Sequence, residues 1–410
     1  MARILQPHDA HVIIQELVNQ ATGKNLAVVD TSTFVSAGET ALASGMENVL
    51  NALSLIIGRT LVASRPYSGK LNILNAINTG VYTHRLRKIS FYGRETEAAG
   101  NFNTVDNAGA AYKTNLANGY DNGINGGVST ESMWMQNQPI PLELNFAGSN
   151  VWQDSSTIYV DQLKAAFRDE ASFNSFLAGV LTERENDIES QKEANRRMTL
   201  LNFIAGAADI GYSVNMVTAF NTRFGTSYTA AQLLSTYYKQ FYEFFVATVR
   251  RYSDLLTDRT SIYHWNPTRS DGLKLLRHTP KDKQRMILYK PVWTEAEAMV
   301  FPEVFNEQYI KESAWEGVNY WQSPQTPDTM NVTPAIPGGV GGVQTVGNTF
   351  NPDKVLGVLF DEDACMVDTQ LVDAMPSPVE ARKRYYNLWY SFSYNSIVDL
   401  TENAIVFYMN

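Results

Sequence analysis

Two segments that lie far apart in the chain constrain its fold more than any other feature. Residues 171–209 place apolar side chains at helical spacing, and a rise of roughly 1.5 Å per residue gives an unbroken helix a length of about 50–60 Å. Residues 384–409 alternate aromatic and polar side chains and finish on the apolar run 404–408, which predicts two strands of one sheet. We therefore expect a rigid platform in which a long helix lies flat against the terminal strands.

The long helix is predicted to be amphipathic, with an apolar stripe on one side and charged residues on the other. The stripe is formed by Phe173, Leu177, Val180, Ile188, Met198 and Leu201. The opposite side carries Glu185, Glu189, Glu193 and Arg197. Glu193 and Arg197 stand four residues apart, which is the favourable spacing for an ion pair along a helix. The apolar stripe is therefore the side that we expect to face the core.

Composition bounds the class of protein. The 410 residues suffice for two or three domains, and 44% hydrophobic with 18% charged residues is ordinary for a globular chain. The net charge of −9 argues against a broad basic face for nucleic acid, although it leaves room for a protein that encloses DNA. The single cysteine rules out an intrachain disulfide. The start lacks the apolar run of a signal peptide, and the run 52–57 is too short to span a bilayer, so we expect a soluble cytosolic protein.

The N-terminal part predicts short elements around a long polar insertion. A helix from Asp9 to Gly23 precedes any domain core and is expected to form an arm, and a second helix is expected to start near Gly38. Strand-like pieces follow at 60–63, 71–74, 87–92 and 140–146. Residues 100–132 are rich in asparagine and glycine and have few apolar anchors. Two interpretations of them stay open: the mobile tip of an extended hairpin, or a disordered insertion.

The C-terminal part predicts a separate α/β region. It begins with a helix from Thr229, and further elements are expected as strands at 273–276, 286–289 and 354–360, a small helix from Thr294, and a Pro/Gly-rich loop at 323–347. The first helix spaces its aromatic residues helically: Tyr238, Phe241, Phe245 and Tyr252. Such a stripe is usually core. An alternative stays open, because the helix with Arg250 and Arg251 also resembles a surface on which nucleic-acid bases stack. Its aromatic residues would be Tyr237, Tyr238, Phe241, Tyr242, Phe244 and Phe245.

No arrangement of residues supports catalysis, a cofactor or a metal site. The glycine run 338–342 lacks the lysine of a phosphate loop and predicts a flexible turn. The histidines are expected on the solvated surface: His8, His11, His84, His264 and His278. The one pair with metal-site spacing, His8 and His11, lacks the cysteines or carboxylates that a closed site needs. Residues 361–363 with Asp368 lack the glycine and the terminal glutamate of a calcium loop, so we expect a solvated acidic turn. Cys365 has carboxylate neighbours, which raise a thiol pKa, so a small buried hydrophobe is expected.

The order of these parts resembles the Hong Kong 97 (HK97)-type capsid fold of tailed phages, most closely the major capsid proteins of the short-tailed, phi29-like group. The resemblance rests on residues 47–62 (helix to strand), 157–177 (leading into the long helix), 358–367, and 385–407. Each stretch is moderately specific, and their order is more so. The chain departs from this group in a longer Gly/Asn-rich hairpin tip and in ending at Asn410 directly after the last strand.

The resemblance implies an α+β, HK97-like fold in five parts. These are an N-terminal arm and helix (1–60), an extended loop and its base (61–165), the spine helix of a peripheral domain (166–214), an axial domain (215–380), and C-terminal strands of the peripheral domain (381–410). Loops of an axial domain meet at the centre of each pentamer or hexamer. The loop 323–347 is our candidate for one of them.

The function that the resemblance implies is that of a major capsid protein, which self-assembles into pentamers and hexamers and forms the icosahedral head shell around the double-stranded DNA of a tailed phage. It implies no enzyme activity and no cofactor. Expected partners are other copies of the chain, the portal, a scaffolding protein, and minor or cement proteins. DNA would be enclosed without sequence-specific contacts. The expected location is the virion, after assembly in the host cytoplasm.

Candidate subunit-interface residues come from the predicted hairpin and from the Pro/Gly-rich loop. They are Tyr92, Arg94, Asn101, Phe102, Asn118, Tyr120, Met133, Trp134, Pro334 and Pro337. Two other functions remain as alternatives at this point. One is the shell of an encapsulin-type nanocompartment, and the other is a single-stranded nucleic-acid binding protein.

Overall fold

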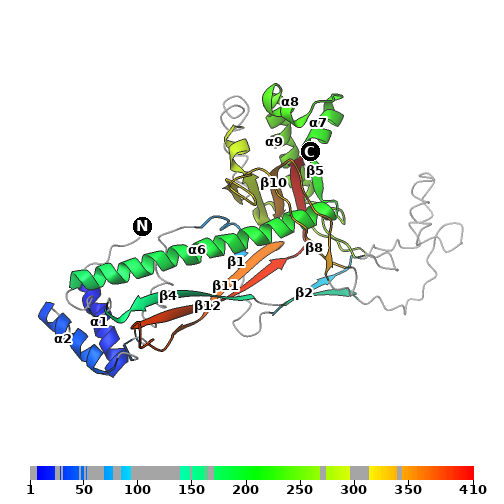
Figure 1. Cartoon of the computed structure of the whole chain (residues 1–410). Helices are drawn as coiled ribbons and strands as arrows, with labels where there is room; N and C mark the ends of the chain where they lie inside the picture. Colours follow the sequence, from blue (N-terminus) through cyan, green and yellow to red (C-terminus); the bar gives the residue numbers. More distant parts are fainter. Residues whose placement is uncertain are drawn as a thin grey trace, which may run out of the picture.

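A 40-residue helix and two β-sheets organise the computed structural model, which describes residues 7–23, 28, 31–45, 48–49, 52, 69–76, 85–93, 139–147, 150–161, 164, 170–267, 274–295, 314–338 and 344–410. The helices are α1 (Pro7–Thr22), α2 (Thr31–Ala43), α6 (Glu170–Asp209), α7 (Met216–Phe224), α8 (Ala230–Ser235) and α9 (Tyr238–Leu255). Helix α6 contacts strands of both sheets, and Figure 1 shows it running along one sheet to the foot of the other. This confirms the predicted platform of one long helix on terminal strands.

The first sheet lies beneath α6 and has the strand order β1-β11-β12-β4. Its strands are β1 (Asn75–Ala76), β11 (Cys365–Pro376), β12 (Tyr385–Val398) and β4 (Asn150–Tyr159). Strands β11, β12 and β4 pair antiparallel, whereas β1 pairs parallel with β11. Along β12, Tyr386, Leu388, Tyr390 and Phe392 are buried, and the residues between them are more exposed. The alternation seen in the sequence therefore marks a sheet with one covered face.

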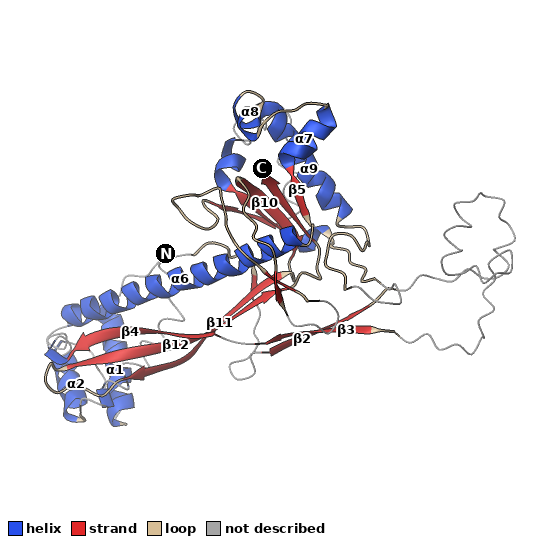
Figure 2. Cartoon of the chain, turned by 45° about the vertical axis from the view of Figure 1, so that its right-hand side comes forward, coloured by secondary structure: helices blue, strands red, loops and turns tan. Residues whose placement is uncertain are grey.

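The second sheet has the order β5-β13-β10-β6-β7 and carries α7, α8 and α9 (Figure 2). Its strands are β5 (Ser213–Asn215), β13 (Ala404–Met409), β10 (Lys354–Asp361), β6 (Gln284–Tyr289) and β7 (Ala314–Val318). Strands β10 and β13 are almost entirely buried, as their continuous apolar sequences require. The predicted strands 286–289 and 354–360 are thus confirmed. The main hydrophobic core lies between this sheet, α7, α9 and the C-terminal half of α6.

The prediction that the chain end forms two strands of one sheet is wrong. Strand β12 belongs to the first sheet and β13 to the second. The segments β10–β11 and β12–β13 run side by side as a two-stranded ribbon, in which β10 pairs with β13 and β11 pairs with β12. Both segments bend at the same level, so the ribbon leaves the first sheet and enters the second. The bends are residues 362–364 and 399–403, and Asp399 donates its backbone N–H to Ala364 across them. Periodicity reports which residues share a face, but it does not report that a ribbon changes sheets.

The charged side of α6 is buried, which also corrects the sequence interpretation. Glu193 and Arg197 are among the least exposed charged residues, whereas Met198 from the predicted stripe is exposed. The side chains of Phe173, Leu177, Val180 and Glu185 lie outside the described residues. Ile188 and Leu201 are buried as predicted. Chain segments lie on both sides of this helix, so its polar side also needs partners, and the ion pair supplies them.

The N-terminal helices pack on their own chain. Gly23 ends α1 with a left-handed φ of 69°, as its sequence position predicts. Residues of both helices, including Leu17 and Phe34, share a core with Ile188 of α6 and Tyr390 of β12. The assignment of residues 1–60 to an arm stays a prediction, with these helices packed on the body of their own chain. Helix α2 also starts at Thr31 rather than near Gly38, and it ends at Ala43.

Strands β2 (Arg85–Phe91) and β3 (Pro141–Ala147) form an antiparallel hairpin that projects beside the first sheet (Figure 2). They confirm the two predicted flanks, and the insertion at 100–132 lies outside the described residues. The predicted strand 71–74 is wrong because those residues form a turn over α6, where Leu71 and Ile73 donate their N–H groups to the Glu316 carboxylate. The predicted strand 60–63 lies outside the described residues.

The region after Thr229 differs in detail from the prediction. The single expected helix is two helices, because Thr229 and Gln232 form a capping box on the short α8 and a new helix starts at Tyr238. The expected strand 273–276 is reduced, among the described residues, to isolated bridges at Lys274 and Arg277. The helix expected from Thr294 already begins at Lys290. Two short strands, β8 (Ala335–Ile336) and β9 (Thr345–Val346), pair within the Pro/Gly-rich loop, and 281–283 form a 3-10 turn.

Candidate assembly surfaces

One face of the β2–β3 hairpin is apolar and exposed. Ile89 is 51% exposed and Phe91 is 59% exposed, and Pro141 is the register partner of Phe91. Beside them Arg87 donates to the Glu143 carboxylate at 2.6 Å. The residues between these positions point to the body of the chain, since side chains alternate along a strand. We call Ile89, Phe91 and Pro141 the hairpin face.

A second exposed apolar surface lies on the first sheet, on the side away from α6. Met375 is 62% exposed and its register partner Trp389 is 40% exposed. Tyr159 and Tyr385 lie edge to face, with ring centroids 6.0 Å apart. The groups between them are polar and uncharged: Thr157 donates to the Asn387 side-chain oxygen at 2.7 Å, and Gln153 donates to Ser391 at 3.1 Å. We call this surface the outer sheet face, with Tyr159, Met375 and Trp389 as its apolar residues.

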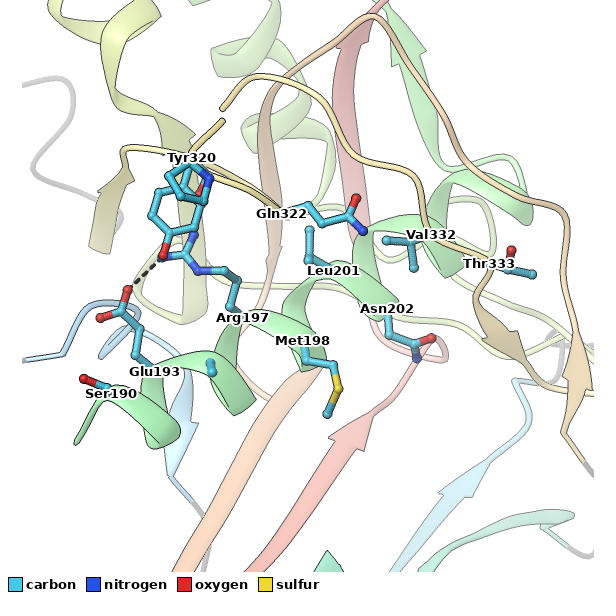
Figure 3. A pocket seen from close by; sticks show the side chains of 12 residues that line it. Ser190, Glu193, Arg197, Met198, Leu201, Asn202, Tyr320, Gln322, Val332 and Thr333 are labelled. Carbon is cyan, nitrogen blue, oxygen red and sulfur yellow. Dashed lines mark hydrogen bonds and ion pairs between the residues drawn. The ribbon is translucent and has the colours of Figure 1, made fainter. Parts of the chain in front are cut away.

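An open depression of about 650 Å³ lies between α6 and the segment 320–333 (Figure 3). On one side of it, the Arg197 guanidinium donates to Glu193 at 2.8 Å, to the Trp321 carbonyl oxygen at 3.3 Å and to the Tyr320 carbonyl oxygen. The same guanidinium lies 3.8 Å from the centre of the Tyr320 ring, which is a cation–π contact. These groups satisfy one another. The arrangement fastens α6 to the second sheet's loop and presents no nucleophile next to a base.

The polar groups singled out in the sequence have structural roles where the structure describes them. His264 is fully buried, so its expected place on the surface is wrong. Its ring bonds to the Leu275 carbonyl and the Asn403 side chain, and burial lowers its pKa, which keeps it neutral. Asp361 is buried rather than solvated, and burial raises its pKa while Thr279 donates to it at 2.8 Å. Within the described ranges no three acidic, histidine or cysteine residues gather as metal ligands.

The single cysteine gives a direct test of the core. Cys365 begins β11 and is fully buried, as the sequence predicts, and burial raises the pKa of its thiol. We expect a thiol reagent such as Ellman's to react with the folded chain at least about a hundredfold more slowly than with the chain in urea, because reaction needs local opening. The urea reaction should titrate one thiol per chain, and Cys365→Ser should titrate none. Rapid reaction in native buffer would contradict this packing.

Most of the predicted interface residues lie outside the described residues, and their role stays a prediction. These are Arg94, Asn101, Phe102, Asn118, Tyr120, Met133 and Trp134. Of the others, Tyr92 is 8% exposed and packs with Leu142 and Leu275, so it offers little surface to a neighbour. Pro334 is buried and Pro337 is partly exposed beside the β8–β9 pair. Tyr92 therefore belongs to the root of the hairpin, whereas the two prolines belong to the Pro/Gly-rich loop.

Sequence reasoning missed the residues of both exposed faces. A signal was available in β2, where Ile89 and Phe91 put apolar side chains on the face that carries the charged Arg87. Apolar residues on both faces of a two-stranded hairpin indicate that both faces are covered in the functional state. On the first sheet, Trp389 likewise lies among polar residues on the exposed face of β12. An exposed tryptophan is the residue type most enriched in binding energy at protein interfaces.

The family of the chain follows from comparison with known proteins. A family described as Phi29-like phage major capsid protein matches residues 124–408, well over half of the sequence. The chain belongs to this family. It is therefore a structural capsid protein that assembles with other copies into a phage head shell and is a component of the virion. No curated protein matched the sequence.

Solved structures place the capsid protein's fold with tailed-phage capsids. The capsid structure of Staphylococcus phage Andhra superposes with a TM-score of 0.51 at 10% identity and covers 84% of each chain. A structure of native bacteriophage P68, described as that of its head fibre and inner core protein, gives 0.50 at 10% identity and covers 84% of this chain and 85% of that one. These likenesses confirm the HK97-type, α+β fold. Among the described helices of the capsid protein, none is long and apolar enough to cross a membrane.

Proposed function

We propose that copies of the capsid protein join through the hairpin face of one copy and the outer sheet face of the next. The two faces are different surfaces of one chain, so their contact is head-to-tail, and repeated head-to-tail contacts close into rings when the rotation allows it. Pentamers and hexamers built in this way form the icosahedral shell around the double-stranded DNA. The exposed apolar residues Ile89, Phe91, Met375 and Trp389 are the observation that supports this most directly.

The same proposal assigns the parts of the chain to domains. The four-stranded sheet with α6 would form the peripheral domain, the β2–β3 hairpin the base of the extended loop, and the five-stranded sheet with α7–α9 the axial domain. The loop 323–347 would lie at the centre of each ring. Further partners in the proposal are the portal, a scaffolding protein and minor or cement proteins, and assembly would take place in the host cytoplasm. The net charge of −9 is consistent with DNA that is enclosed rather than bound specifically.

The two alternative functions find no support. Base stacking on α9 would need a row of aromatic rings at the surface, but Phe241, Tyr242 and Phe245 are buried, although Tyr238 is 37% exposed. Tyr228 and Tyr237 stack on each other at 4.1 Å. The encapsulin-type shell shares the fold, whereas the matching family is that of phage capsid proteins.

Electron microscopy of the purified protein tests the proposal. Produced alone or together with a scaffolding protein of the same phage, the chain should form closed megadalton particles in which five-fold and six-fold rings are visible. Light scattering should confirm the particle masses. Closed particles are expected to be stable because each subunit contributes several weak contacts that become effectively intramolecular in a closed shell. A chain that stays monomeric under all of these conditions would contradict the proposed assembly. So would a particle map in which Phe91 and Trp389 face solvent.

A further inference from the structure

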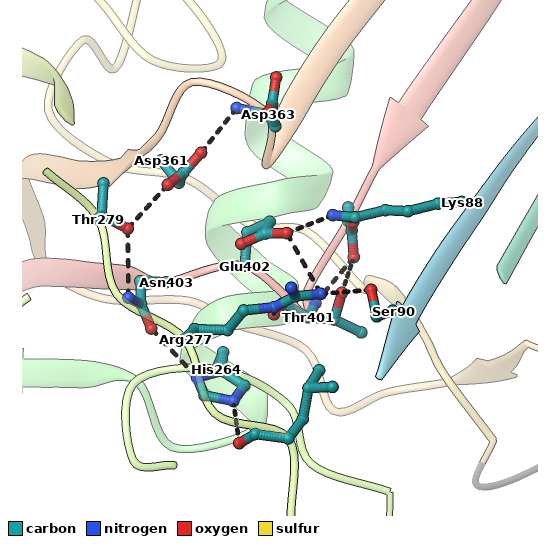
Figure 4. A network of polar contacts seen from close by, with 12 residues as sticks. Lys88, Ser90, His264, Arg277, Thr279, Asp361, Asp363, Thr401, Glu402 and Asn403 are labelled. Carbon is teal, nitrogen blue, oxygen red and sulfur yellow. Dashed lines mark hydrogen bonds and ion pairs between the residues drawn. The ribbon is translucent and has the colours of Figure 1, made fainter. Parts of the chain in front are cut away.

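Four charged side chains meet where the β2–β3 hairpin joins the body of the chain (Figure 4). Lys88 of β2 forms ion pairs with Asp399 and Glu402, which lie in the bend between β12 and β13. Arg277 lies 3.4 Å from the Glu402 carboxylate and donates to the Ser90 hydroxyl at 2.6 Å and to the Thr401 carbonyl oxygen at 3.1 Å. Asp399 also accepts from the Thr401 N–H at 2.9 Å. Two cations and two carboxylates thus balance within one group, which we call the root cluster.

The root cluster joins segments that are far apart in sequence. Lys88 and Ser90 belong to the hairpin, Arg277 to the segment before β6, and Asp399 and Glu402 to the bend through which the ribbon passes between the two sheets. Other contacts of the hairpin with the body include the small apolar group of Tyr92, Leu142 and Leu275 and the hydrogen bond from Gly93 N–H to the Lys274 carbonyl at 2.9 Å.

Because these charges are buried, the ion pairs of the cluster form at only one position of the hairpin relative to the body. Asp399 is almost fully buried and the Lys88 side chain is 22% exposed, so both lose hydration that only a well-placed partner replaces. A rotation of the hairpin that separated Lys88 from the bend would leave the cluster with two carboxylates and one cation, Arg277. Apolar contacts tolerate such a rotation because they have no preferred direction, whereas buried ion pairs do not.

We propose that the root cluster is a latch that holds the β2–β3 hairpin at one angle to both sheets and releases it as a unit when the ion pairs are exchanged for contacts with another copy. The hairpin's own hydrogen bonds pair β2 with β3, so they survive release. The latch itself is a property of the single chain. Its consequence, that the hairpin angle sets how adjacent subunits meet, rests on the proposed function.

The latch is not an acid switch. Burial raises the pKa of Glu402, against the opposing effect of Lys88 and Arg277, so the latched state holds a proton on Glu402 more readily than a released, hydrated one. Burial lowers the pKa of Lys88, but Asp399 and Glu402 outweigh it and raise that pKa above 10.5, so the Lys88 charge is lost only in alkali. The neighbouring His264 is kept neutral by burial, and Asp361 is also held toward its protonated form. Mild acid therefore does not favour release, and competing contacts have to supply it.

Hydrogen exchange of the unassembled chain tests the latch. We expect Lys88→Met to speed exchange about tenfold or more in peptides that contain Gly93, because its N–H donates to the Lys274 carbonyl across the root and is exposed when the root opens. The matched control is Arg87→Met, at the preceding position of the same strand. The Arg87 side chain is 57% exposed and pairs with Glu143 within the hairpin. This control should leave these peptides unchanged. Lys88→Arg keeps the charge and should retain most of the protection.

Peptides from α9 report whether the fold itself survives. Equal exchange at the root in Lys88→Met and in Arg87→Met, with α9 protected in both, would overturn the latch. If Lys88→Met also exposes α9, then Glu402→Gln, which preserves shape, decides: faster exchange confined to the root supports the latch, and unchanged exchange overturns it. Because the measurement is made on single chains, failure of the latch is distinguishable from failure of the proposed hairpin-to-sheet contact, which is read from assembled particles.

Discussion

Phe91→Asp should abolish shell assembly while the subunit remains folded. The side chain is 59% exposed on the hairpin face, so a carboxylate there is hydrated in the free chain and changes the free energy of unfolding by about 0.5 kcal/mol or less. In the proposed contact the same carboxylate is desolvated without a partner. Loss of an aromatic contact at the centre of an interface costs about 2 kcal/mol or more, or roughly a thirtyfold weaker contact. Every subunit carries the change, so the loss is repeated around each ring.

Sedimentation velocity and negative-stain microscopy measure this outcome. The control is Ile262→Asp, which places the same charge on an apolar residue that is as exposed as Phe91 but lies on neither proposed face. It should assemble like the unaltered chain. Particles of normal size and yield from Phe91→Asp would show that the hairpin face is not a subunit contact.

Arg197→Ala should produce a large loss of stability. The change removes the partner of the buried Glu193 carboxylate and the donor to the carbonyl oxygens of Tyr320 and Trp321. The hydrogen bond from the Lys70 N–H to Glu193 at 3.2 Å is retained, but it does not balance the carboxylate charge. Breaking a buried pair by removing one partner typically costs about 3–5 kcal/mol, because a charge is left buried without compensation.

Urea unfolding followed by circular dichroism measures the loss. Arg196→Ala is the matched control, because the neighbouring arginine reaches Glu189 at 3.4 Å from a more exposed position, and such a pair is worth about 0–1 kcal/mol. Similar midpoints for the two variants would show that the Glu193–Arg197 pair does not fasten α6 to the loop before β8. A larger loss for Arg196→Ala would contradict the burial pattern itself.

The sequence predicts best those elements in which the pattern of apolar residues within the element is enough to show which face is buried. The 171–209 helix, the strands around 88 and 143, and strand 354–360 were confirmed because one periodicity dominates each of them. The aromatic stripe after Thr229 was correctly interpreted as core for the same reason. The order of the elements along the chain also indicates the capsid fold.

The errors arose where a partner distant in sequence decides the outcome. Glu193 and Arg197 were assigned to the polar side of α6 because the pattern cannot show that residues 69–73 and 314–321 cover that side. The sheet assignment of β12 and β13 failed because the bend at 399–403 is fixed by hydrogen bonds to β10 and to the segment around 264–279. The exposed faces are not predicted because their proposed partner is another molecule. The pattern of one chain indicates its own core but not which surface residues contact another copy.

The placement of β12 and β13 bears on when a subunit can exist at all. Strand β12 lies between β11 and β4, and β13 lies between β10 and β5, so residues 385–409 supply an interior strand to each sheet. On the ribosome, a nascent chain that has reached residue 384 lacks both, and neither sheet can bury its apolar face. We therefore expect a chain truncated before residue 385 to remain unfolded and to be unable to join a shell.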